Sequence, residues 1–159
     1  MAFDSKEQRR IMGHFATGVT VMSTTVGDKT WGMTANAVMS LSLDPPLVLV
    51  AVDKKSQTHA YLKQSKCFAL NILSSDQELI STRFASAGPK DFSDLQTIVA
   101  ETGAPILVDV LGYVDCRLVD ILAGGDHDLF IGEIVAGDAA EGQPLLFYRG
   151  RYAQLAMES

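Results

Sequence analysis

The sequence predicts a mainly β domain, an antiparallel barrel with a few short helices. Apolar and β-branched residues form roughly six to eight short runs, and several of them alternate with polar residues. The links between these runs are short and rich in Gly, Pro and Asp, as in hairpins. No GxGxxG motif follows a strand, which argues against a Rossmann nucleotide site. Together these observations favour an antiparallel barrel over βαβ units.

The elements follow one another from an N-terminal helix into strands. Segment 5–16 carries charged residues together with Ile11, Met12 and Phe15 at helical spacing, which predicts a short amphipathic helix. From Gly18 the residues become β-branched and alternate, which predicts strands. The predicted strands are, in order, 18–25, a run from Thr30, 38–43, 47–52, 66–73, 110–122, 129–136 and 151–156. The turns between them include Gly27-Asp28-Lys29, Asp44-Pro45-Pro46 and Gly124-Gly125-Asp126.

Two further helices and one long loop interrupt the strands. Segment 56–64 follows the Lys54-Lys55 corner and is predicted to be a short helix. Ser75-Asp76-Gln77-Glu78 fits a capping box, which predicts a helix that continues to about Phe84. Residues 86–105 are rich in Gly, Pro and Asp and are predicted to form a long excursion. Loops of this length are often functional.

Composition and charge limit the classes of protein to consider. The chain has 159 residues, of which 47% are hydrophobic and 20% charged, as expected for one globular domain. The net charge of −6 argues against a nucleic-acid partner, because such binding needs a basic face. A phosphorylated ligand is still possible, since charges are screened over about 8 Å at physiological salt and two local lysines can dominate.

The cysteines and the apolar runs suggest a cytoplasmic protein. Cys67 and Cys116 lie in apolar segments far apart in sequence, so they are interpreted as buried reduced thiols rather than a disulfide. No Cys/His spacing suggests a metal site. The N-terminus lacks an apolar signal core, and the run 47–52 is far shorter than the roughly 20 residues of a membrane span.

Four segments could carry chemistry, the first being Gly32-Met33-Thr34-Ala35-Asn36-Ala37. Small residues beside a strand let backbone N–H groups approach a flat ligand such as a flavin ring. The alternative is a strand whose small residues serve packing.

The second segment, 52–58, contains two lysines followed by two hydroxyl residues at a helix start. Helix N-termini bind anions through free N–H groups and the helix dipole. The alternative is a plain N-cap beside a solvated charge pair.

Histidine and arginine mark the other two segments. His127 lies between two aspartates after a Gly-Gly turn, so it could donate a proton, form a hydrogen-bonding clamp or simply belong to the turn. His14 and His59 have weaker cases, the latter because it is placed on a short surface helix. Arg83-Phe84-Ala85 with Lys90-Asp91-Phe92 combines cations and aromatic rings, which suits a nucleotide or flavin edge, or else a helix end and a solvated loop.

Taken in this order, the segments resemble the flavin reductase-like FMN-binding family. The resemblance covers roughly residues 8–156 and includes the strings 15–21, 32–37, 40–48, 68–73, 83–85, 125–133 and 144–148. The Ser-Leu-Asp-Pro-Pro and Gly-Asp-His strings are specific in combination. Val38-Met39 replaces the Phe-Thr pair often found in the family after the Thr-Ala-Asn segment, so any aromatic contact made by that Phe is absent.

The resemblance implies a single split β-barrel domain over residues 1–159. It also implies a homodimer with a flavin near the subunit interface, and a role as the reductase component of a two-component monooxygenase. The isoalloxazine ring would contact Thr34, Ala35, Asn36 and Ala37, with Ser40 beside it. The ribityl chain and phosphate would be bound by Ala51, Val52, Asp53, Lys54, Lys55, Ser56 and Thr58. Another flavin edge would be covered by Arg83, Phe84, Ala85 and, with less support, Lys90. The nicotinamide would lie near His127, with Gly18 and Tyr152 as further neighbours.

The hypothesis from the sequence is therefore a flavin reductase that transfers a hydride from NADH or NADPH to FMN or FAD. His127 is expected to orient the nicotinamide or to shuttle a proton. Two other functions stay open: an FMN carrier or sensor that does not turn over NAD(P)H, and an interaction domain without FMN.

Overall fold

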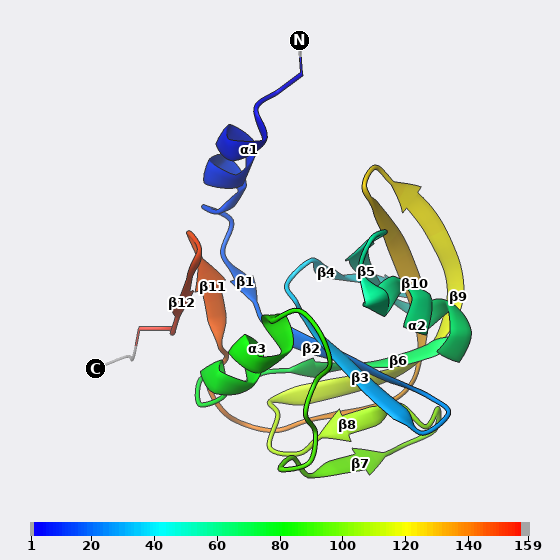
Figure 1. Ribbon diagram of the computed structural model, residues 1–159. Coiled ribbons are helices and arrows are strands. Elements are labelled where there is room, and N and C mark those ends of the chain that lie inside the picture. Colours follow the sequence, from blue (N-terminus) through cyan, green and yellow to red (C-terminus); the bar gives the residue numbers. More distant parts are fainter. Residues whose placement is uncertain (1, 157–159) are drawn as a thin grey trace.

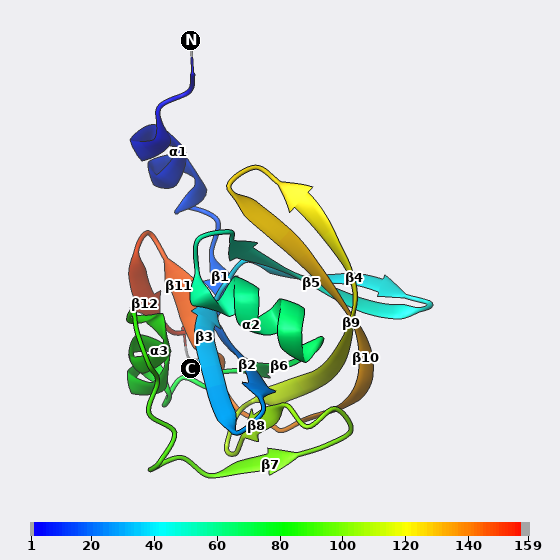
Figure 2. The same ribbon diagram turned by 45° about the vertical axis from the view of Figure 1, so that its right-hand side comes forward.

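A curled, seven-stranded antiparallel sheet forms the body of the protein (Figures 1 and 2). The structure is a computed structural model that describes residues 2–156. The spatial order of the strands in the seven-stranded sheet is β3-β2-β6-β9-β10-β5-β4. In chain order these strands are β2 (Thr20–Val26), β3 (Lys29–Ala35), β4 (Val38–Leu43), β5 (Pro46–Asp53), β6 (Cys67–Ile72), β9 (Gly112–Gly124) and β10 (His127–Ala139). The prediction of a mainly β fold is confirmed.

The two edges of this sheet are consecutive in the chain. β3 and β4 lie at opposite ends of the strand order, yet only Asn36 and Ala37 separate them. The sheet must therefore curl until its edges come within reach of a two-residue link. The Ala51 N–H of β5 donates to the carbonyl of Ala37 in this link at 3.0 Å. The described ladders form open sheets, and they do not close a barrel between β3 and β4.

The described part of the chain also contains two small sheets. One contains β1 (Thr17–Gly18), β11 (Leu146–Tyr148) and β12 (Arg151–Ala153), and the other contains β7 (Thr97–Val99) and β8 (Pro105–Leu107). The predicted excursion over 86–105 is thus not wholly irregular, because it holds β7. The predicted strand over 151–156 ends at Ala153, and β11 was not predicted.

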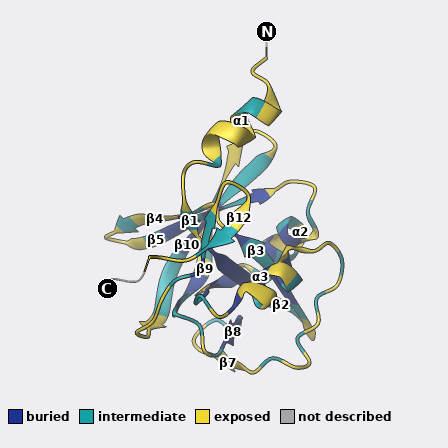
Figure 3. Ribbon diagram, turned by 90° about the vertical axis from the view of Figure 1, so that its left-hand side faces the viewer, coloured by how far each residue is buried: buried dark blue, intermediate teal, exposed yellow. Residues whose placement is uncertain are grey.

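Within residues 2–156, three helices accompany the sheets. α1 (Ser5–Met12) is capped by Asp4, contributes no buried side chain and extends away from the body (Figures 1 and 3). α2 (Gln57–Ser65) begins after its N-cap Ser56, as predicted. α3 (Glu78–Ala85) lies where a helix was expected. No helix within residues 2–156 is long and apolar enough to cross a bilayer.

The capping box predicted for α3 is wrong. Gln77 occupies the N-cap position and makes no side-chain capping bond there. Its Oε1 instead accepts a hydrogen bond from the Ser74 N–H at 2.9 Å. The side chain therefore serves the preceding turn rather than the helix N-terminus.

α2 closes one side of the larger core cluster. Leu62 of α2 packs with Val50, Phe68 and Phe130, and all four side chains are buried. Cys116 belongs to the same cluster, and burial raises the pKa of its thiol to about 12. Because the thiolate is the reactive form, this cysteine is chemically inert at neutral pH.

A glycine lets β10 pass close to this core. A Cβ at Gly132 would lie 2.6 Å from Phe68 Cζ and 2.8 Å from Cys116 Cβ. We expect Gly132→Ala to lower the free energy of unfolding by about 1–3 kcal/mol in urea denaturation, because the buried Phe68 ring cannot move aside freely. Gly124→Ala, where the nearest atom is Leu129 Cγ at 3.4 Å, is the control. Equal stability of both variants would contradict tight packing at Gly132.

Candidate active site

An apolar groove lies along the link between β3 and β4. It has a volume of about 760 Å³. The residues predicted to bind cofactor that line it are Gly18, Asn36, Ala37 and Ala51. Thr17 lines it too, and its Oγ1 is buried with no hydrogen-bond partner within residues 2–156. Buried polar groups usually have a hydrogen-bond partner, so this hydroxyl is available to a polar atom that enters the groove. A flat, largely apolar ring with polar edges, such as a flavin ring, fits these walls.

A second hollow of about 560 Å³ collects residues from three segments that are distant in sequence. The predicted residues that line it are Thr34, Lys55, Ser56, Thr58, Phe84, Ala85 and Lys90. The β3–β4 segment borders both spaces, because Thr34 faces this hollow while Asn36 faces the groove. The β5–α2 segment does the same through Ala51 and Lys55. The structure thus brings most of the predicted cofactor residues around two spaces that draw on the same two segments of the chain.

Trp31 shapes the second hollow and was not singled out from the sequence. Its indole stacks on Tyr61 with ring centroids 4.9 Å apart, and its Nε1–H donates to Thr58 Oγ1 at 2.8 Å. Lys90 Nζ lies 5.7 Å from the centroid of the Trp31 ring. Partial burial lowers the pKa of Lys90. The sequence offered one hint of its importance, because Trp31 is the single tryptophan of the chain.

The corner between β5 and α2 is held by its own hydrogen bonds. Asp53 Oδ1 accepts from the Lys55 N–H at 2.8 Å, and Ser56 Oγ donates to the Asp53 carbonyl at 2.9 Å. Ser56 Oγ also accepts from the His59 N–H at 3.4 Å, as an N-cap does. The capping interpretation is therefore correct, and it leaves Ser56 at the wall of the second hollow. Val52 is fully buried, so only its backbone could approach a ligand.

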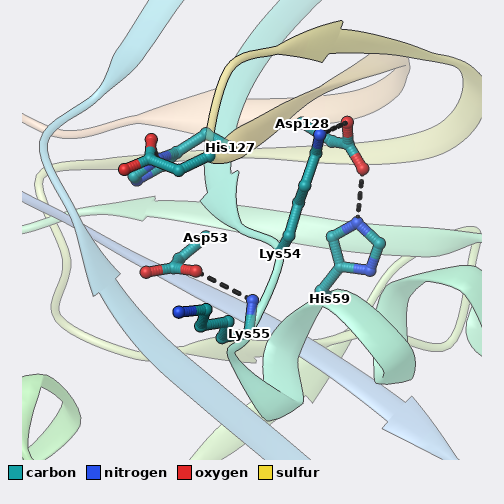
Figure 4. A network of polar contacts seen from close by, with 7 residues as sticks. Asp53, Lys54, Lys55, His59, His127 and Asp128 are labelled. Carbon is teal, nitrogen blue, oxygen red and sulfur yellow. Dashed lines mark hydrogen bonds and ion pairs between the residues drawn. The ribbon is translucent and has the colours of Figure 1, made fainter.

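His127 lies beside this corner. It is the first residue of β10 and pairs with Asp53 across the β5–β10 ladder. Its Nδ1 is 2.7 Å from Asp126 Oδ1, and this hydrogen bond lowers the pKa of Asp126. With 42% of its side chain exposed, His127 is accessible from solvent (Figure 4).

Arg83 is engaged away from both spaces. Its guanidinium makes a bidentate pair with Asp94, at 2.7 and 3.0 Å, and donates to the Asp91 carbonyl at 3.2 Å. The pair with Asp94 raises the pKa of Arg83. In this conformation Arg83 anchors the 86–96 loop. The neighbouring Phe84 is buried, and its ring packs against Phe92.

Ser40 and Tyr152 also lie outside the two spaces. Ser40 is exposed on β4. The Tyr152 hydroxyl is hydrogen-bonded to Ser81 Oγ at 2.6 Å. Thr34 Oγ1 donates to the Ser81 carbonyl at 2.6 Å, so Tyr152 supports the wall at Thr34 through one intervening residue.

His59 is more closely integrated than its expected place on a surface helix. Only 15% of its side chain is exposed, and its Nε2 lies 2.7 Å from Asp128 Oδ2. Sequence reasoning missed this pair because the two residues are 69 positions apart. No group of three or more His, Cys, Asp or Glu side chains within residues 2–156 is arranged to hold a metal ion.

Comparison with known proteins assigns the chain to a family. Residues 12–156 match the flavin reductase-like domain family. The chain belongs to that family, and the resemblance found in the sequence is confirmed.

Individual relatives agree with this assignment. The chain is 40% identical over 149 residues to the reductase component of a 4-nitrophenol 4-monooxygenase/4-nitrocatechol 2-monooxygenase from Rhodococcus opacus. The match covers 94% of this chain and 80% of that relative. It superposes on the flavin reductase PheA2 with a TM-score of 0.90 and 43% identity, covering 98% of this chain and 100% of that one.

A third relative was solved with ligand fragments. This is the NADH:FAD oxidoreductase SgcE6 from Streptomyces globisporus, in complex with NAD and FAD fragments. It has a TM-score of 0.90 and 34% identity, covering 98% of this chain and 97% of that one.

Proposed function

We propose that this chain is an NAD(P)H-dependent flavin reductase that transfers a hydride from NADH or NADPH to FMN or FAD and supplies the reduced flavin to a partner monooxygenase. One observation carries the proposal: segments 34–37 and 51–55 each contribute residues both to an apolar groove and to a lysine-bearing hollow. A flavin has the same two-part character, a flat ring and an anionic tail. The names of the relatives support the same reaction.

The groove and the hollow divide the flavin between them. Asn36, Ala37 and Ala51 border the ring, and their small side chains let the ring approach the backbone closely. Lys55 and Ser56 hold the phosphate at the start of α2, where backbone N–H groups and the helix dipole favour an anion. When bound, the flavin supplies the ring atom that accepts the hydride.

The protein's own residues orient the reactants and exclude water. The apolar walls of the groove keep water from the reacting face. His127, exposed at the start of β10, orients the nicotinamide or moves a proton at its imidazole. These residues need to hold the two rings within roughly 3–3.5 Å for hydride transfer.

The assembly and setting are part of the same proposal. The chain forms a single split-barrel domain over residues 1–159 that assembles as a cytoplasmic homodimer. Apolar side chains on the β4–β5 arm, among them Met39 and Leu43 at 48% and 91% exposure, support a second copy as their cover. The groove is also bordered by Met12 and Phe15, which are exposed in the single chain.

Nicotinamide oxidation tests the proposed reaction directly. The purified protein is mixed with NADH or NADPH, with and without FMN, FAD or riboflavin, and the nicotinamide absorbance is followed. We expect oxidation that depends on added or bound flavin, and its rates rank both cofactors. Tight flavin binding without oxidation in any combination would contradict a reductase and leave a flavin carrier or sensor.

A further inference from the structure

We propose that His59 and Asp128 form a positioning pair that keeps the β5–α2 corner in the shape that binds the flavin phosphate. The inference rests on the proposed placement of the flavin and extends it to residues that line neither the groove nor the hollow. Its experimental test therefore separates phosphate recognition from reductase activity.

The pair ties two elements together from a sheltered position (Figure 4). His59 lies in the first turn of α2 and Asp128 is the second residue of β10. Their Nε2 and Oδ2 atoms are 2.7 Å apart, and the side chains are only 15% and 17% exposed. The His59 ring also stands edge-on to the buried Phe130 ring, with centroids 5.1 Å apart. Packing and hydrogen bonding therefore fix the imidazole in one orientation.

Asp128 also reaches the corner itself. Its Oδ1 lies 3.9 Å from Lys54 Nζ, while the Lys54 N–H donates to the Asp126 carbonyl at 3.1 Å. The same corner contains Ser56, whose hydroxyl accepts from the His59 N–H. One aspartate thus connects the start of β10 with both sides of the turn that leads into α2.

Strand geometry separates the role of Asp128 from that of its neighbour. Successive side chains of a strand point to opposite faces, so His127 and Asp128 diverge, as Figure 4 shows. His127 is 42% exposed and open to a substrate, whereas Asp128 is directed toward α2. The pair therefore acts on the β5–α2 corner, while His127 stays open on the other face of the strand.

The balance of charge makes the pair necessary for anion binding. The corner holds the ammonium groups of Lys54 and Lys55, but the carboxylates of Asp53, Asp126 and Asp128 outnumber them. A free carboxylate beside a bound phosphate would repel it. The hydrogen bond from His59 and the contact with Lys54 keep the Asp128 charge engaged and directed away from the hollow.

The test compares a flavin that has a phosphate with one that lacks it. FMN and riboflavin are titrated into the protein and binding is followed by flavin fluorescence. In the wild-type protein we expect FMN to bind more tightly. In His59→Ala and Asp128→Asn, we expect the FMN Kd to rise about tenfold and the riboflavin Kd to stay within about twofold, because charged hydrogen bonds contribute about this much.

Matched variants identify a merely structural effect. His59→Gln keeps an amide donor toward Asp128 and should retain the wild-type preference for FMN. Asp138→Asn makes the same chemical change at the exposed far end of β10 and should behave as wild type. Melting temperatures of all variants identify any variant that has lost its fold. If His59→Ala does not fold, the flavin affinities of His59→Gln and Asp128→Asn still test the inference.

Turnover measurements add a second readout. If the pair acts on phosphate binding, the KM for FMN rises in Asp128→Asn while kcat is nearly unchanged. Three results would each overturn the inference. The first is that both variants bind FMN and riboflavin equally more weakly, and the second is that Asp128→Asn binds FMN more tightly. The third is that the wild-type protein binds FMN and riboflavin with the same affinity. A wild-type protein that prefers FMN but oxidises no nicotinamide would contradict the reductase function and leave the pair supported.

Discussion

Replacing His127 by alanine should lower kcat about a hundredfold, because a positioned acid–base or orienting group contributes about 10²–10⁴ to rate. His127 lines neither the apolar groove nor the second hollow. Flavin affinity should therefore be nearly unchanged, and the loss should fall on the step that involves the nicotinamide. Steady-state kinetics with a flavin-binding titration on the same preparation measures both quantities.

His14→Ala is the matched control for this variant. His14 lies just after α1, and its Nδ1 is hydrogen-bonded to the Arg10 carbonyl at 2.8 Å. We expect this variant to keep its activity. Full activity in His127→Ala would remove this histidine from the mechanism, and parallel loss of flavin binding would give it a role in holding the flavin.

Replacing Asp115 by alanine should lower the free energy of unfolding by about 3–4 kcal/mol. Hydrogen bonds to a charged group contribute about 1.5–3 kcal/mol each, and water that binds the freed N–H and O–H groups offsets part of the loss. Asp115 is fully buried on β9. Its carboxylate accepts hydrogen bonds from the Glu101 N–H at 2.8 Å, the Thr102 N–H at 2.9 Å and Thr102 Oγ1 at 2.5 Å. Urea denaturation followed by circular dichroism measures the change.

Asp120→Ala is the control for Asp115→Ala. Asp120 is on the same strand but exposed, and it accepts only from the adjacent Ile121 N–H. Its replacement should change stability by less than about 0.5 kcal/mol. If Asp115→Ala were equally mild, the turn at residues 101–102 would be able to release its N–H groups to water without cost.

Local sequence patterns predicted the long strands and missed the short ones. Strands β5 and β10 contain the continuous apolar runs 47–52 and 129–132, and a sequence reveals such runs directly. β1 and β11 have only two and three residues, too few for a period to be recognised. The capping box failed because Gln77 bonds to Ser74 on its N-terminal side, a choice made by the preceding turn.

The candidate site was predictable where one short segment carries it. Asn36 and Ala37, or Lys55 and Ser56, are neighbours in sequence and share a wall in the structure. Contacts between distant segments were not accessible in this way. Asp94, which engages Arg83, and Asp128, which binds His59, become partners only once the chain has folded.

The two-residue link between β3 and β4 restricts how this protein can evolve. Three Cα steps from Ala35 to Val38 cover at most about 11 Å, so the link keeps the two sheet edges together and simultaneously borders the groove. An insertion at Asn36 or Ala37 would relax the curl and displace the groove wall at once. Length variation is far better tolerated in the exposed loop 86–96. New ligand preferences should thus arise by substitution at the link and by insertion or deletion in that loop.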